Sequence, residues 1–244
     1  MLGRAVPCFI ISQSPRFPGC ATYGESVDRK PCLLVACMQV RETMAVGSTY
    51  ISEAEYLQTE REAEVKREYL RGQVFAMAGA PFAHVRIATN LIGTLYQDLH
   101  GTGCMVLSGD MRVKVSEASA DFYPDVLVVR GQPFFEDDRA DSLLNSVLIF
   151  EVLSSSTEEF DRREKFLAYQ QLESLREYVL VSQERVWVEQ WGRQADETWL
   201  RREYTQPEQE LRLESVGGGR CPYRRSIRDG RCRRHLLQRR RANL

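Results

Sequence analysis

Two carboxylates in the middle of the chain stand inside apolar segments, where an unpaired charge is costly. Asp125 follows Pro124 in FYPDVLVV, and Glu151 lies within VLIFEVL. A buried carboxylate needs a hydrogen-bond donor, a base or a metal, and two neighbouring carboxylates repel each other unless a cation lies between them. Mg²⁺ prefers oxygen ligands and keeps several waters. The pair therefore predicts a Mg²⁺ site carried by strands, in which Mn²⁺ could substitute.

Lys165 could complete such a site from a helix. It lies in SSSTEEFDRREK, where Ser156 and Glu159 have the spacing of a capping box. A helix that leaves directly from the Glu151 strand can fold back over the strand end. Lys165 could then stabilise a hydroxide or a phosphate oxygen beside the metal.

Each of these three residues also has a structural interpretation. Asp125 could cap backbone amides at the start of a strand. Glu151 could pair with an arginine of the following helix, and Lys165 could be an exposed helix lysine paired with Asp161 four residues earlier. We interpret Tyr169, on the same helix face as Lys165, as core packing.

The elements that must position these residues follow an α/β pattern. Strands are predicted from alternating or continuous apolar runs and helices from apolar residues at helical spacing, such as Val85, Ala88 and Leu91. Helices are predicted over residues 51–61, 64–70, 84–100 and 158–173, and strands over 72–79, 104–116, 121–130, 146–154, 177–193 and 197–206.

The arrangement of these motifs is similar to the PD-(D/E)XK nuclease superfamily, and more closely to its Uma2 family, also called DUF820. The matching stretches are EYLRGQVFAMAGAPFAHVRIATNL, SGDMRVKV, YPDVLVV and EVLSSSTEEFDRREKFLAYQQLESLREYVLV, within about residues 50–215. The resemblance implies a restriction-endonuclease-like α+β core with a central mixed sheet flanked by helices. It also implies two-carboxylate metal catalysis, with nucleic acid, expected to be DNA, as substrate.

The resemblance adds two candidate site residues, and the sequence departs from the superfamily motif at one position. Glu68 could reach the metal from the second helical run, and His84 could contact the scissile phosphate or act as an acid or base. Asp110 is interpreted as a turn residue. The superfamily motif places a lysine two residues after its acid, but here that position is Leu153, so Lys165 must take its role.

The two ends of the chain differ in composition from the middle. Residues 44–219 hold 18 Lys and Arg against 30 Asp and Glu, a net charge of −12, whereas residues 220–244 hold ten Arg and one Asp. Residues 1–43 lack periodicity, which indicates a spurious or disordered extension before a domain over 44–216. The tail, 217–244, is interpreted either as frameshifted or as a basic arm that binds nucleic acid.

Cysteine usage and hydropathy exclude other classes. The seven cysteines form no CxxC pair and no Cys/His zinc spacing, which favours reduced thiols in a cytoplasmic protein. No apolar run reaches the roughly 18–20 residues of a membrane span.

We therefore expect a Mg²⁺-dependent endonuclease, with Asp125, Glu151, Lys165 and His84 catalytic and Asp125, Glu151 and Glu68 holding the metal. The alternative is a non-catalytic nuclease-fold binding module, or a homodimer linked to mobile elements or genome defence. A third hypothesis is the unfoldable product of a decaying gene. A homodimer is expected for the nuclease as well.

Overall fold

The structure is a computed structural model that describes residues 50–217 and 219–221 of the 244-residue chain. All of these residues fall within one compact unit, Arg41–Leu244. The expected N-terminal extension, residues 1–43, and residues 222–244 of the basic tail lie outside the described part of the chain. Within the described residues, no helix is long and apolar enough to cross a membrane.

A six-stranded mixed sheet forms the centre of the unit, in the order β11-β10-β9-β8-β6-β3. Strands β8 and β9 run parallel, and every other neighbouring pair in this sheet is antiparallel. The strands are β3 (Cys104–Ser108), β6 (Val126–Arg130), β8 (Ser146–Leu153), β9 (Glu177–Ser182), β10 (Val188–Arg193) and β11 (Trp199–Tyr204). This confirms the expected central mixed sheet flanked by helices.

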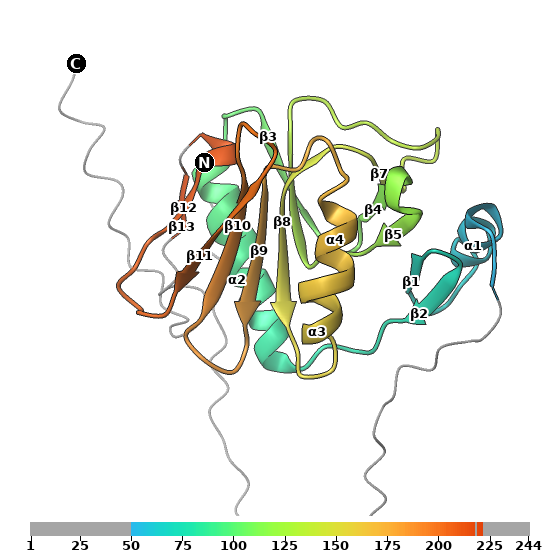
Figure 1. Ribbon diagram of the computed structural model, residues 1–244, viewed down its shortest axis with the longest axis horizontal. Coiled ribbons are helices and arrows are strands. Elements are labelled where there is room, and N and C mark those ends of the chain that lie inside the picture. The colour runs from blue at the N-terminus through green and yellow to red at the C-terminus, as the bar shows by residue number, and fades with distance from the viewer. Residues whose placement is uncertain (1–49, 218, 222–244) are drawn as a thin grey trace, which may run out of the picture. The chain divides into compact units, whose positions relative to one another are not determined.

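All eight residues of β8 are buried, because elements cover both faces of the sheet. Helix α2 (Phe82–Leu99) lies behind the sheet in Figure 1, and the helical segment that begins with α3 (Glu158–Phe160) lies in front of it. Leu148, Phe150 and Val152 belong to the core shared with α2, whereas Ile149 and Leu153 belong to the core on the other face. Since side chains alternate along a strand, Glu151 points toward the second face, into an otherwise apolar environment.

The helical segment after β8 provides the crossover that two parallel neighbours require. It consists of α3, a π-helical turn at Asp161–Lys165, and α4 (Phe166–Tyr169). The expected capping box of Ser156 and Glu159 is wrong: the Ser154 hydroxyl accepts the Thr157 N–H at 3.3 Å, and α3 has no side-chain cap. The Ser154 hydroxyl satisfies the Thr157 N–H, two residues earlier in the chain than predicted.

A second, five-stranded sheet packs on the α4 side, in the order β2-β1-β5-β4-β7. Its strands are β1 (Arg67–Leu70), β2 (Gln73–Ala76), β4 (Arg112–Val115), β5 (Ala120–Phe122) and β7 (Ser142–Leu143). The predicted segment 104–116 is therefore divided between two sheets, at a turn that contains Asp110 as expected.

Strand β1 corrects the helix predicted over residues 64–70. Arg71 and Gly72 both have positive φ, 50° and 86°, and join β1 to β2 as a tight antiparallel hairpin. A two-residue turn of this kind matches the twist of paired strands, which explains why the chain is extended on both sides of it. The alternating charges of EVKRE indicate a solvated helix face, but Glu68 and Tyr69 are buried.

The helices predicted over residues 51–61 and 84–100 are confirmed as α1 and α2, with small differences in their bounds and buried faces. Helix α1 (Glu53–Glu60) begins after Ser52, whose hydroxyl accepts the Glu55 N–H. Helix α2 buries Ile87 but leaves the predicted core residue Val85 half exposed. Two further strands, β12 (Leu211–Leu213) and β13 (Gly219–Cys221), form a small antiparallel pair.

Candidate active site

Lys165 lies at the centre of a buried cluster of carboxylates. Its Nζ atom is 2.8 Å from Glu68 Oε1, 3.1 Å from Glu151 Oε1 and 3.4 Å from Asp161 Oδ1. The four side chains are only 4–8% exposed. Lys165 is therefore neither the exposed lysine of the structural interpretation nor paired with Asp161 alone.

Three different elements position this cluster. Glu151 comes from β8 of the central sheet, Glu68 from β1 of the smaller sheet, and Lys165 with Asp161 from the π-helical turn. Glu68 Oε1 also accepts the Tyr123 N–H at 3.0 Å, which fixes its carboxylate on the second sheet. The arginines that follow Glu151 are occupied elsewhere: Arg162 pairs with Glu158 and Glu189, so the arginine alternative for Glu151 does not hold.

Asp125 and His84 extend the cluster toward solvent. Asp125 Oδ2 accepts the Val152 N–H at 2.7 Å, and its Oδ1 lies 2.8 Å from His84 Nε2. The Asp125 N–H in turn approaches Glu151 Oε2 at 3.4 Å. The side chains of Asp125 and His84 are 20% and 16% exposed, so this end of the cluster is the one that faces solvent.

Charge is unbalanced in this site. Burial raises the pKa of Glu151 well above its ordinary range; Lys165 opposes the rise, and the carboxylates of Asp161, Asp125 and Glu68 add to it. Burial likewise raises the pKa of Glu68. Burial alone would lower the pKa of Lys165, but Glu151, Glu68 and Asp161 outweigh it, so this pKa is raised well above its ordinary range. Lys165 is therefore held as an ammonium among three carboxyl groups, two of which have a raised pKa because burial disfavours their charged form.

All five predicted residues thus belong to one connected network, from Glu68 through Lys165, Glu151 and Asp125 to His84. Asp161 was missed as a member. Its spacing of four residues from Lys165 was a signal for contact, but that spacing is also typical of surface pairs.

The sequence model of the Uma2 family, described as "Putative restriction endonuclease", matches residues 53–221, which include the whole network. The chain belongs to the Uma2 family. Two proteins of Synechocystis sp. (strain ATCC 27184 / PCC 6803 / Kazusa) are similar to it. Uncharacterized protein sll1609 is 37% identical over 158 residues, 64% of this chain and 89% of that protein. Uncharacterized protein slr1290 is 32% identical over 168 residues, 68% of this chain and 86% of that protein.

A solved structure supports the fold of this Uma2 chain. A crystal structure from Anabaena variabilis ATCC 29413, described as a putative nuclease belonging to DUF820, matches with a TM-score of 0.62 at 13% identity. The match covers 72% of this chain and 97% of that one. The expected restriction-endonuclease-like, mixed α+β core is thereby confirmed as a fold.

Leu153, at the position where the resemblance led us to expect a lysine, is buried in the core two residues after Glu151. Lys165 reaches the Glu151 carboxylate from the π-helical turn instead. The ammonium is therefore supplied by the helix that follows the strand.

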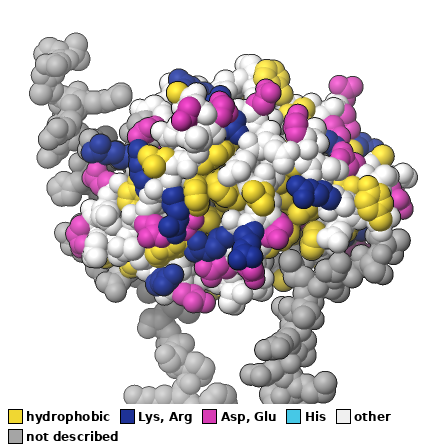
Figure 2. All heavy atoms as spheres, viewed as in Figure 1, with side chains coloured by type: hydrophobic (Ala, Val, Ile, Leu, Met, Phe, Trp, Pro, Cys, Tyr) yellow, Lys and Arg dark blue, Asp and Glu magenta, His cyan; other side chains and the backbone are white. Residues whose placement is uncertain are grey.

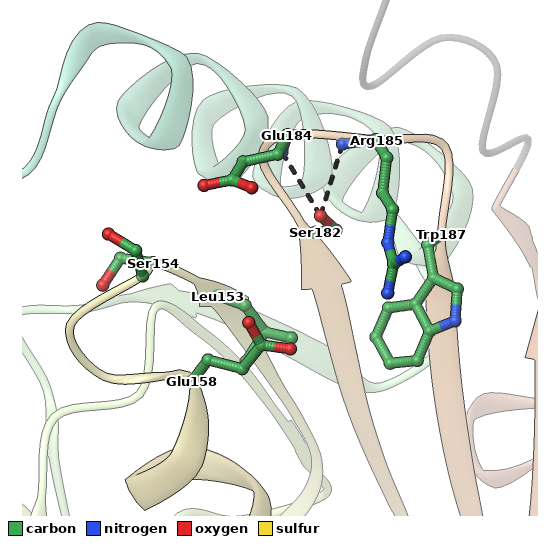
Figure 3. Close-up of a pocket in the computed structure, with 8 residues that line it drawn as sticks. Leu153, Ser154, Glu158, Ser182, Glu184, Arg185 and Trp187 are labelled. Carbon is green, nitrogen blue, oxygen red and sulfur yellow. Dashed lines mark hydrogen bonds between the residues drawn. The ribbon is translucent and has the colours of Figure 1, made fainter.

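A cavity of about 200 Å³ lies beyond Leu153, at the carboxyl ends of β8 and β9. In Figure 3, Ser154 and Glu158 line one side, and Arg185 and Trp187 line the other. Its remaining lining residues are Leu153, Ser155, Ser182 and Glu184. The cavity is thus adjacent in sequence to Glu151 but is lined by a mixture of hydroxyls and both signs of charge.

Proposed function

We propose that this chain is a Mg²⁺-dependent endonuclease that hydrolyses phosphodiester bonds in DNA. The observation that carries the proposal is the convergence of Glu68, Glu151 and Asp161 on one buried lysine, with Asp125 at the solvent-facing end. For folding alone, a buried group of this charge is unfavourable compared with apolar residues of similar size. Membership of the Uma2 family, described as "Putative restriction endonuclease", supports a nuclease role for this cluster.

The donor set of the cluster fits a hard divalent cation. Carboxylate oxygens are the ligands that Mg²⁺ prefers, and four carboxylates exceed the charge of one ammonium. Among the described residues, no group of three or more His, Cys, Asp or Glu side chains lies so that it could hold a metal ion as it stands, and Lys165 lies between Glu68 and Glu151. Asp125 and Glu151 would hold the ion with Glu68 assisting, and waters would fill the other positions. The ion would supply Lewis-acid activation of water and neutralise phosphate charge.

The side chains of this chain have distinct roles in the proposed reaction. Lys165, charged and fixed by its carboxylate neighbours, places a positive charge near the negative charge that develops on the phosphate. His84 contacts Asp125 through Nε2 and its side chain is partly exposed, so its other ring nitrogen, Nδ1, would exchange a proton with the attacking water or the leaving group. The carboxylate of Asp125 orients this imidazole while its other oxygen is fixed by the Val152 N–H.

The surface charge sets a condition on substrate binding. Figure 2 shows Lys and Arg interspersed with Asp and Glu on the viewed face, without a continuous basic area. With a net charge of −12 over residues 44–219, long-range attraction of DNA is weak. The divalent ion and nearby cations therefore have to supply the local attraction for phosphate.

The test is nicking of supercoiled plasmid by the full chain in Mg²⁺ or Mn²⁺. The parent is expected to nick, and Asp125→Asn to lose activity by at least about 100-fold. Asp138→Asn is the matched control, because Asp138 is an exposed aspartate outside the site. Thermal melting of each variant verifies that the lost activity does not reflect unfolding.

One observation favours the rival function, a non-catalytic nuclease-fold binding module. Lys165 already occupies the space between Glu68 and Glu151 that a metal would otherwise take. A binding module predicts that the folded parent leaves plasmid intact in both metals while retaining DNA in a mobility-shift assay. Equal nicking by the parent and Asp125→Asn would instead contradict the assignment of the site.

A further inference from the structure

Asp161 is the third buried carboxylate around Lys165, and the proposed reaction gives it no role of its own. Its side chain is 4% exposed, and Lys165 Nζ, at 3.4 Å, is its ion-pair partner. Its backbone carbonyl accepts the Tyr178 hydroxyl at 2.9 Å, which fixes the π-helical turn against β9. The carboxylate is therefore held in place from its own backbone and aimed at the lysine.

Folding stability does not explain why a carboxylate stands at this position. Lys165 already has two carboxylate partners at shorter distances, Glu68 and Glu151. Burial raises the pKa of both glutamates, and the negative charge of Asp161 raises it further. An uncharged side chain at position 161 would relieve this repulsion and leave Lys165 paired.

The directions from which the three carboxylates contact Lys165 do explain why position 161 carries a carboxylate. Glu68 and Glu151 contact Lys165 from two different sheets, whereas Asp161 contacts it from the helical segment that carries the lysine. Three carboxylates on different sides fix a flexible four-carbon side chain in one position, which two would not do. An error of about 1 Å in the placement of a catalytic group can lower a rate by about 100-fold.

We propose that Asp161 is a positioning residue that sets the location of the Lys165 ammonium for catalysis. This inference rests on the proposed nuclease function, but its effect on Lys165 can be observed without catalysis. It predicts that catalytic activity and folding stability, which often fall together in a variant, change separately here. Loss of Asp161 should impair the reaction while leaving the fold as stable as before, or more stable.

The experiment compares Asp161→Asn, Asp161→Glu and Glu164→Gln in the full chain. Glu164 is the matched control, because it is an exposed carboxylate of the same π-helical turn. For each variant, the melting temperature and the kcat and KM of plasmid nicking are measured. Asp161→Asn is expected to lower kcat by about 10- to 100-fold with KM within about twofold. Asp161→Glu is expected to recover part of that loss.

The second readout is the ¹H–¹⁵N signal of the Lys165 ammonium in uniformly labelled protein. The chain has four lysines, Lys30, Lys66, Lys114 and Lys165, so the spectrum is simple, and Lys165→Met identifies the signal. A buried, triply paired ammonium should give a signal protected from exchange with water. Asp161→Asn should shift or broaden it, and Glu164→Gln should not.

The outcomes distinguish this inference from the proposed function. Unchanged kcat and an unchanged ammonium signal in Asp161→Asn would overturn it. A lower melting temperature in both Asp161 variants, with no recovery by glutamate, would also overturn it and assign Asp161 a purely structural role. If the parent does not nick plasmid, the proposed function fails, and the Lys165 signal alone decides whether Asp161 positions the lysine.

Discussion

At the scale of single residues, Lys165 carries the positive charge that three buried carboxylates share. A buried ion pair as a whole contributes little to stability, but removal of one partner is costly because it leaves the other charge buried. Here one lysine has three such partners, Glu68, Glu151 and Asp161. Its removal therefore affects the fold as well as the proposed reaction.

We predict that Lys165→Met lowers the free energy of unfolding by about 3–5 kcal/mol at pH 7. Methionine has a similar length but leaves the carboxylates unpaired, so the cost is electrostatic. Urea denaturation monitored by circular dichroism measures the change. Arg163→Met, an exposed cation two residues away, should change it by no more than about 0.5 kcal/mol. Equal effects of the two substitutions would show that Lys165 is not buried among the carboxylates.

The residue types of the site were recognisable in the sequence, but their contacts were not. Asp125 and Glu151 stand out because each is a charge among apolar residues, and both lie in the network. The ion pair between Lys165 and Glu68 depends on how the two sheets pack together. The spacing of residues in the sequence does not reveal this packing. Asp161 was interpreted only as the partner of a surface pair, because the sequence does not show that this helix face is covered.

At the scale of elements, the hairpin of β1 and β2 determines where Glu68 lies. Sequence reasoning found the strong apolar elements, α2, β6, β8 and β9, because each contains a continuous or periodic apolar run. It missed β1 and β7, which are four and two residues long and contain charged residues or serine, and it merged β5 with β6 in the strand predicted over residues 121–130. Such short strands are determined by their partners in the sheet more than by their own composition.

We predict that Gly72→Ala destabilises the protein by about 1–2 kcal/mol. Gly72 has φ of 86°, and a Cβ atom there would also clash with the Tyr50 ring. Thermal or urea unfolding measures the effect, and nicking activity should fall if the hairpin displaces Glu68. Gly93→Ala is the matched control, because Gly93 is in α2 with open space for a methyl group, and alanine there should stabilise by about 0.5–1 kcal/mol. The same sign for both substitutions would contradict the turn conformation.

At the scale of the whole molecule, a second buried charge cluster on the smaller sheet affects the pH dependence of stability. Burial raises the pKa of Asp121 to about 6, although Lys114 and Arg112 oppose the rise. Because this value lies above the ordinary 3.8, the folded state binds the proton more tightly than the unfolded state. The contribution of Asp121 to stability is therefore present below about pH 4 and is lost as the pH rises to about 6.

We predict that Asp121→Asn raises the free energy of unfolding at pH 7 by at most about 3 kcal/mol and changes it little at pH 4. The asparagine side chain cannot ionise. The decrease in the free energy of unfolding between pH 4 and pH 6 that Asp121 causes should therefore be absent in this variant. Urea denaturation at several pH values measures it, with Asp138→Asn, an exposed carboxylate, as control. A variant whose stability still falls across this range would show that Asp121 is not the group responsible.

Glu68 and Glu151 belong to different sheets, and this has a consequence for how the protein can lose activity. Neither sheet alone contains the lysine cluster, so the proposed catalytic centre exists only while the two sheets remain docked. A partial opening that leaves both sheets intact would admit water to the interface between the two sheets, which we call the seam. The side chains of the lysine cluster would then separate. The chain would then become inactive through a subglobal opening of lower free energy than complete unfolding. The seam between the sheets is thus the place where heat, denaturant or a binding partner could inactivate the protein reversibly.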